Sequence, residues 1–272
     1  IEIVMNIANG ALERMDDRLD DGTKNSVDAD IVCLAVAMLT NLALNPKTRS
    51  DIVSVGAVPV IIGLSHNGNE SIARACASAL RGLTSDDDIE NLTRIMRDGG
   101  IQAVLRLSTS TSDVVTRRNC ALAMRNILSH TETLEELLNN PNMANMLTDM
   151  YEALYGLLSL PRDVDVVRYT LLSMYNLSCT TSGASRLRLV SGNLVSRIVE
   201  IVDAWSAGEE ELPMDVRSLC ASFLYNVSLS QANITRILND GTFRCLPLLM
   251  GVYEEERRAS VMEMETDGNS MS

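Results

Sequence analysis

Apolar residues recur along this chain at the three- and four-residue spacing of amphipathic helices, and one helical phrase occurs five times. The phrase reads AMLTNLA, SALRGLT, LAMRNIL, LSMYNLS and SFLYNVS. Its fifth residue, here called the marker, is Asn41, Gly82, Asn126, Asn176 and Asn226 in turn. Successive markers lie 41, 44, 50 and 50 residues apart, and periods of this length indicate stacked helical repeats.

A second phrase of apolar residues, glycine and a further apolar run keeps phase with the first. It occurs at Gly10, Gly56, Gly100, Gly192 and Gly241, and the segment NNPNMANML around Asn142 fills the remaining slot. Glycines of this kind end helices, so each repeat is predicted to hold a short first helix, a second helix and a long third helix. In one repeat, for example, Asp113 is expected to cap the third helix.

These signals predict an all-α superhelical solenoid of about five to six repeats over residues 1–256, followed by a disordered polar tail at 257–272. The chain is expected to begin inside a first helix, IEIVMNIANG. The longer polar links at 20–29 and 206–213 are expected to loop out.

The short, medium and long helices, the glycine after the first helix and the A-L-x-N-L-S-like phrase together resemble armadillo repeats. HEAT repeats are the nearest alternative, and the recurring asparagine favours armadillo. The resemblance implies a right-handed α-solenoid of the catenin and importin type. It also implies that the third helices line a concave groove, in which asparagine side chains hold the backbone of an extended peptide. Carried over by position, these side chains are Asn41, Asn126, Asn176 and Asn226, with Gly82 interrupting the row.

Each marker carboxamide both donates and accepts, so it suits a peptide unit whatever the side chain of the ligand. The alternative is that these asparagines bridge neighbouring turns within the solenoid.

The helical period places the core positions of each third helix two and six residues before the marker and one residue after it. The marker and the positions one and eight residues before it form the opposite side, here called the third-helix face. At one residue before the marker lie Thr40, Arg81, Arg125, Tyr175 and Tyr225. At eight residues before it lie Cys33, Arg74, Arg118, Arg168 and Ser218.

The five arginines of this face predict a site for an acidic or phosphorylated segment, as in the catenin-like groove, because a guanidinium matches carboxylate or phosphate at two points. Tyr175 and Tyr225 would extend the site as amphipathic contacts. The alternative is an ordinary solvated face. Importin-α-like relatives carry tryptophan four residues before the marker, whereas Ala37, Ser78, Leu122, Leu172 and Ser222 stand there in this chain. The absence of tryptophan at these positions argues against a receptor for basic peptides.

Composition narrows the remaining classes of function. The net charge of −13 and an aromatic content of 3% argue against nucleic-acid binding. No catalytic motif, cofactor-binding motif or metal-ligand spacing is present, so the chain is predicted to be no enzyme and to need no cofactor or small-molecule substrate. No apolar run reaches the length of a membrane span. Cys76, Cys120 and Cys220 share one repeat position and are expected to be buried thiols in a reducing compartment, the cytoplasm or nucleus.

The sequence therefore predicts a protein-interaction scaffold that binds an extended, acidic or phosphorylated partner segment. Two alternatives stay open: an importin-α-like transport adaptor for basic peptides, and a structural armadillo protein of cilia or cytoskeleton. In the tail, Arg257 and Arg258 precede Ser260 with the spacing favoured by basophilic kinases, which makes Ser260 a candidate phosphorylation site.

Overall fold

The computed structural model describes residues 1–16, 22–85, 89–130, 134–135, 138–141, 144–159, 163–179, 193–206 and 212–239. The chain divides into two compact units, Ile1–Leu177 and Ser178–Ser272. All regular elements among the described residues are helices, and each unit is treated by itself below.

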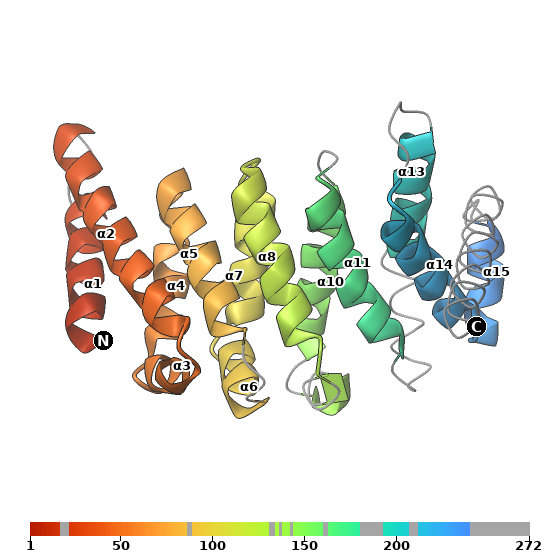
Figure 1. Cartoon of the computed structure of the whole chain (residues 1–272), viewed down its shortest axis with the longest axis horizontal. Coiled ribbons are helices and arrows are strands. Elements are labelled where there is room, and N and C mark those ends of the chain that lie inside the picture. Colours follow the sequence, from red (N-terminus) through yellow and green to blue (C-terminus); the bar gives the residue numbers. More distant parts are fainter. Residues whose placement is uncertain are drawn as a thin grey trace, which may run out of the picture. The chain divides into compact units, whose positions relative to one another are not determined.

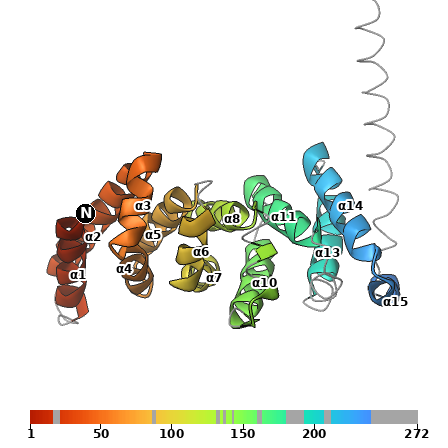
Figure 2. The ribbon, with the colours of Figure 1, turned by 90° about the horizontal axis from the view of Figure 1, so that it is seen from below.

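The first unit contains ten of these helices (Figures 1 and 2). They are α1 (Glu2–Asp16), α2 (Gly22–Ala43), α3 (Pro46–Ser54), α4 (Ala57–Leu64), α5 (Glu70–Leu83), α6 (Ile89–Arg97), α7 (Gly100–Ser110), α8 (Val114–Ile127), α10 (Ala144–Leu158) and α11 (Val164–Cys179, whose last two residues count with the second unit). The described helices of the second unit are α13 (Leu194–Ser206), α14 (Met214–Ser228) and α15 (Gln231–Asn239).

The five marker phrases all lie in long helices, α2, α5, α8, α11 and α14, as the repeat pattern predicts. In the first unit, α5 packs between α2 and α8, so that third helices of consecutive repeats are direct neighbours (Figure 1). Behind them the second helices also contact one another, with α7 against α10 and α4 against α7. The stacked-repeat prediction is confirmed.

The positions two and six residues before the marker are buried in every third helix, which confirms the predicted core stripe. These residues are Leu39, Leu80, Met124, Met174 and Leu224, and Ala35, Cys76, Cys120, Thr170 and Cys220. The position after the marker is buried in four helices. The exception is Leu42, since α2 has a third-helix neighbour, α5, on one side only among the described residues.

The buried thiols behave as small core groups. Cys33, Cys76, Cys120, Cys179 and Cys220 are all free, and among the described residues no disulfide forms. Burial raises the pKa of both Cys76 and Cys120 to about 12, so these thiols stay protonated and unreactive near neutral pH.

Two glycines end helices: Gly56, as predicted, and Gly99, which directly precedes the predicted Gly100. Gly56 precedes α4 with a φ of 83°, and Gly99 precedes α7 with a φ of 97°. Both angles lie in the left-handed region, where a side chain is strained. Asp113 caps α8 through a hydrogen bond from the Thr116 amide, also as predicted.

Two predictions about the start of the chain are wrong. The helix predicted to end at Gly10 continues as α1 to Asp16, because Ala8 and Ala11 are fully buried and their packing outweighs the modest helix penalty of one glycine. The polar link predicted at 20–29 is instead helical from Gly22 onward, within α2. Its buried Asp28 accepts a hydrogen bond from Arg14 Nε at 2.9 Å, so this polar residue ties α2 to α1.

Several predictions fall outside the described residues. These concern Asn142, Gly192, Gly241, most of the link at 206–213, and the tail at 257–272 with Ser260.

Candidate ligand face of the third helices

The side chains of the third-helix face at one and eight residues before the marker are all exposed or half-buried, as the helical period predicts. Arg74, Arg125 and Tyr225 are exposed, and Tyr225 has 65% of its surface accessible. Arg81, Arg118, Arg168 and Tyr175 are half-buried. The structure thus separates these residues from the apolar core.

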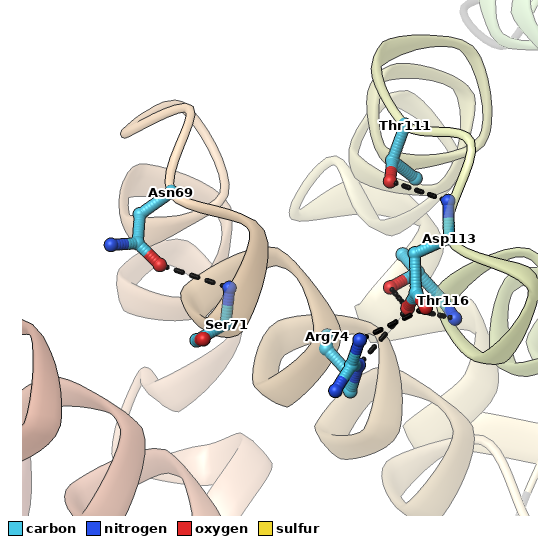
Figure 3. A network of polar contacts seen from close by, with 6 residues as sticks. All are labelled: Asn69, Ser71, Arg74, Thr111, Asp113 and Thr116. Carbon is cyan, nitrogen blue, oxygen red and sulfur yellow. Dashed lines mark hydrogen bonds and ion pairs between the residues drawn. The ribbon is translucent and has the colours of Figure 1, made fainter.

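Arg74 is bonded to the beginning of the next third helix (Figure 3). Its Nε and Nη2 donate to the two carboxylate oxygens of Asp113 at 3.0 and 2.9 Å, a two-point contact. The same carboxylate accepts from the Thr116 amide at 2.9 Å and from its hydroxyl at 2.6 Å. The hydrogen bond from Arg74, together with those from Thr116, lowers the pKa of Asp113 to about 2 despite partial burial.

The same arrangement recurs one repeat later. Arg118 Nη2 lies 2.7 Å from Asp163, which in turn accepts from the Val166 amide in the first turn of α11. Arg118 Nε also lies 3.4 Å from Asp165, to which Arg168 Nη1 donates at 2.6 Å. Burial raises the pKa of Asp163, but the hydrogen bonds from Arg118 and Val166 outweigh burial and lower it overall.

The arginines eight residues before the marker are therefore paired with carboxylates of the chain itself. The pairs link α5 to α8 and α8 to α11, so these guanidiniums connect repeats. This role could not be read from the position of the arginines on the face, which predicted only that they are accessible.

Arg81 and Arg125, one residue before the marker, differ from that row. Neither forms an ion pair with any carboxylate in the described part of the chain. Arg125 Nη1 donates to its neighbour Asn126 Oδ1 at 3.1 Å. The two guanidiniums occupy equivalent positions on the adjacent helices α5 and α8, so they are the positive groups left available on this face.

Two marker asparagines use their amide groups within the solenoid. Asn126 Nδ2 lies 3.2 Å from Ser85 Oγ and 3.4 Å from Thr84 Oγ1, at the end of α5. In the second unit, Asn226 Nδ2 lies 3.0 Å from Ser178 Oγ and 3.4 Å from Cys179 Sγ. Bridging between repeats, the alternative left open above, therefore occurs at both positions.

The remaining marker positions differ in this respect. Asn41 is exposed, Asn176 is half-buried, and neither amide is bonded to another described side chain. At Gly82, a Cβ atom would meet Ala43 Cβ at 3.6 Å and Thr40 O at 3.8 Å. An asparagine there would face Ala43 and Leu44, which stand where Asn126 finds Thr84 and Ser85 and which lack a side-chain acceptor. Contact of any marker amide with a ligand stays a prediction.

Two buried arginines were not singled out by the sequence. Arg117 is only 4% exposed, and it donates to Ser108 O at 2.6 Å and to Gly156 O and Leu157 O at 2.7 Å each. Arg49 donates to Ala43 O, at the last residue of α2, and to Ser85 O, two residues beyond the end of α5. Arg117 lies nine residues before the marker, on the core side of α8. The sequence signal that could have identified Arg117 was a charged residue at a position that the helical period assigns to the core.

The described residues contain no group of three or more metal-ligating side chains and no helix long and apolar enough to span a membrane.

Comparisons with known proteins agree on the architecture. Residues 45–85 match the model of the armadillo/beta-catenin-like repeat. A search of curated proteins finds no match. Among solved structures, the chain is similar to an engineered protein at 18% identity, covering 94% of this chain and 96% of that one, with a TM-score of 0.64.

Two further solved structures carry descriptions of their ligands. A computationally designed armadillo repeat protein for modular peptide recognition is 16% identical, with 82% of this chain and 86% of that chain covered and a TM-score of 0.63. A designed armadillo repeat protein in complex with the peptide (KR)4 is also 16% identical, with 82% and 87% covered and a TM-score of 0.62. At such identities the likeness is one of fold.

Proposed function

Because this chain folds as an armadillo-type repeat solenoid, we propose that it is a binding scaffold that holds an extended, acidic or phosphorylated segment of a partner protein along its third-helix face. Armadillo-type solenoids typically serve as non-enzymatic binding scaffolds, and we propose no catalytic role, cofactor or small-molecule substrate. The free, buried thiols support a reducing compartment, the cytoplasm or nucleus.

One observation carries the proposed sign of the ligand. Arg81 and Arg125 occupy the same repeat position on the neighbouring helices α5 and α8, and neither has a carboxylate partner among the described residues. Arg74, Arg118 and Arg168 each have one. An incoming carboxylate or phosphate at Arg81 and Arg125 would displace no ion pair. At Arg74 or Arg118 it would have to compete with Asp113 or Asp163, so we assign ligand contact to the first pair.

The spacing of the helices suits an extended ligand. Packed helices lie about 8–10 Å apart, and an extended chain rises about 3.3 Å per residue, so each third helix would meet about every third residue of a partner segment. Acidic or phosphorylated residues at that interval would reach Arg81 and Arg125 in succession. Asn176, half-buried in the first unit, offers a further polar contact to such a segment, and Tyr225, exposed in the second unit, offers an amphipathic contact there.

The rival ligand is a basic segment. A designed protein of this fold was solved with a peptide of alternating lysine and arginine, and the net charge of −13 would suit such a ligand. The guanidiniums at Arg81 and Arg125 argue against it, because like charges facing each other weaken an interface.

Charge reversal of the two arginines tests the proposal. The variant Arg81→Glu with Arg125→Glu should bind a fluorescent acidic peptide, for example an extended Glu-rich or phosphoserine-containing peptide, about 10- to 100-fold more weakly than the parent chain. This range follows from losing two charge-assisted contacts. Fluorescence anisotropy gives the dissociation constants.

The control variant is Lys47→Glu with Arg94→Glu, which alters net charge by the same amount at exposed positions of α3 and α6. Equal affinities of the parent chain and the Arg81/Arg125 variant would overturn the proposal. An equal loss of affinity in both variants would show that binding depends on net charge and not on Arg81 and Arg125, and would also contradict the proposal.

A further inference from the structure

The hydroxyl group of Ser85 lies at the junction between α5 and the third-helix face. Ser85 follows Thr84, the C-cap of α5, and is exposed, whereas Thr84 is buried. Ser85 Oγ donates to Arg81 O at 2.6 Å and accepts from Asn126 Nδ2 at 3.2 Å. The hydroxyl is therefore accessible and is already bonded by a side chain of the neighbouring third helix.

Two arginines of the third-helix face are close to this hydroxyl along α5 or through one hydrogen-bonded side chain, whereas Asp86, Asp87 and Asp88, which follow Ser85, lie outside the described residues. Asn126 is bonded at one end to Ser85 and at the other to Arg125, so a single carboxamide separates the hydroxyl from that guanidinium. Arg81 lies one helical turn before Ser85 on α5. Both guanidiniums lack a carboxylate partner in the described ranges.

A third guanidinium, that of Arg49, counteracts the negative partial charge at the end of α5. The carboxyl end of a helix carries partial negative charge, which disfavours a phosphate there. At the end of α5, however, Arg49 is bonded to the carbonyl oxygen of Ser85 itself. Arg49 of α3 therefore bonds the backbone of Ser85, Arg125 of α8 is linked to its hydroxyl through Asn126, and Arg81 of α5 lies four residues before it.

We propose that Ser85 is a phosphorylation site and that Asn126, Arg125 and Arg81 hold its phosphate. A protein kinase would transfer the γ-phosphoryl group of a nucleoside triphosphate. The bond between Ser85 Oγ and phosphorus forms, the bond between the γ-phosphorus and the bridging oxygen breaks, and the hydroxyl proton passes to the base of the kinase. The nucleoside diphosphate leaves. Because Asp86, Asp87 and Asp88 follow Ser85 in the sequence, the kinase belongs to the class that selects acidic residues after its serine.

The consequence concerns regulation and rests on the proposed function. Near neutral pH the phosphate carries roughly 1.5 to 2 negative charges. It brings this charge to Arg81 and Arg125, the two guanidiniums that we assign to the acidic partner. Phosphorylated Ser85 therefore occupies the ligand's place from within the chain. It closes this part of the third-helix face to an acidic segment.

Site mapping tests the modification itself. A purified acidophilic kinase is chosen because it phosphorylates a synthetic peptide of residues 80–92, and it is then incubated with the full chain and ATP. Mass spectrometry should find phosphate at Ser85. Ser129 is the control, since it is the exposed equivalent in the next repeat and is followed by His130 and one nearby acidic residue, Glu132, in place of three consecutive aspartates. A chain that stays unmodified at Ser85, or is modified equally at Ser129, overturns the assignment.

A second measurement tests the contacts of the phosphate independently of any partner. In the chain phosphorylated at Ser85, the phosphorus resonance should titrate with a second pKa lowered from its ordinary value of about 6 by about half a unit to one unit. Arg125→Gln should move this pKa back toward the ordinary value, because only Arg81 then remains to stabilise the doubly charged phosphate. An unshifted titration, or one insensitive to Arg125→Gln, contradicts the proposed contacts.

The effect on partner binding is read from the acidic-peptide assay. Phosphorylation should weaken binding about tenfold or more, and unchanged binding overturns the regulatory inference. If the unmodified chain itself binds no acidic peptide, the proposed function fails, whereas site mapping and the phosphorus titration still decide whether Ser85 is modified and held.

Discussion

Single carboxylates at the start of third helices each stabilise two parts of the fold. Asp113 caps α8 through Thr116 and accepts a two-point contact from Arg74 of α5. Asp163 likewise accepts from the Val166 amide at the start of α11, and it accepts a single contact from Arg118 of α8. One side chain therefore both begins a helix and fixes it to its neighbour, which makes the register between repeats sensitive to these residues.

Asp113 gives the stability of the chain a defined pH dependence. Its pKa is about 2 in the folded chain against an ordinary value of 3.8, so its contribution is present above about pH 4 and is lost as the pH falls from 3.8 toward 2. Asp113→Asn should lower the free energy of unfolding at pH 7 by about 1 kcal/mol. The figure is kept below the full linkage value because Arg74 is half exposed and solvent screens the pair.

Denaturant unfolding of the two proteins between pH 7 and pH 3 checks this expectation. Asparagine is itself a good N-cap residue, so the substitution isolates the ion pair from the cap. Arg74→Gln in the Asp113→Asn background should add almost nothing. A difference between parent and variant that stays constant down to pH 3 would show that the Asp113 charge does not contribute.

The contrast between Arg81 and Arg74 shows how far the candidate site could be predicted. The helical period placed both on the third-helix face and away from the core, and the structure confirms this. The helical period could not distinguish Arg81 from Arg74, because Asp113, the partner of Arg74, is 39 residues away in the sequence. The position of Asp113 depends on how α5 and α8 stack. The same limit applies to Asn126, whose partners Thr84 and Ser85 belong to the preceding repeat.

Buried arginines join the carboxyl ends of helices in the first unit. Arg117 bonds the carbonyl of Ser108 in α7 and those of Gly156 and Leu157 in α10, two second helices that pack together. The partial negative charge at these helix ends compensates a guanidinium that has no carboxylate among its described partners. Burial nevertheless lowers the pKa of Arg117.

Arg117 and its neighbour Arg118 are therefore expected to contribute very differently to stability. Arg117→Met should cost about 3 kcal/mol or more of unfolding free energy, because it leaves three carbonyl groups without their charged donor. Arg118→Gln removes a more exposed ion pair and should cost about 1 kcal/mol or less. Thermal and denaturant unfolding of the two variants measures both values. Similar losses in the two would mean that the helix-end contacts of Arg117 do not stabilise the unit.

Local patterns predicted the existence of the third helices better than the course of the chain between helices. Gly56 and Gly99 end helices because their φ angles are positive, yet Gly10 stays inside α1, where Ala8 and Ala11 pack into the core. Likewise Asp28, an apparent loop residue, is buried and bonded to Arg14. In both cases tertiary packing, which no local pattern reports, decided the conformation.

Over the whole molecule, net charge and local charge oppose each other. The chain carries a net charge of −13, which favours basic partners at long range. Arg81 and Arg125 favour an acidic segment at short range. Salt screens attraction over long distances more strongly than direct contacts, so the two effects separate as ionic strength rises.

The most direct measurement compares the affinities of three peptides of equal length, one Glu-rich, one phosphoserine-containing and one composed of Lys and Arg, by fluorescence anisotropy at about 50 mM and about 300 mM salt. We predict that the acidic or phosphorylated peptide binds at both salt concentrations and that the basic peptide, if bound at low salt, is released at high salt. Retention of the basic peptide at high salt, with no binding of the acidic ones, would contradict the assignment of Arg81 and Arg125 to the ligand.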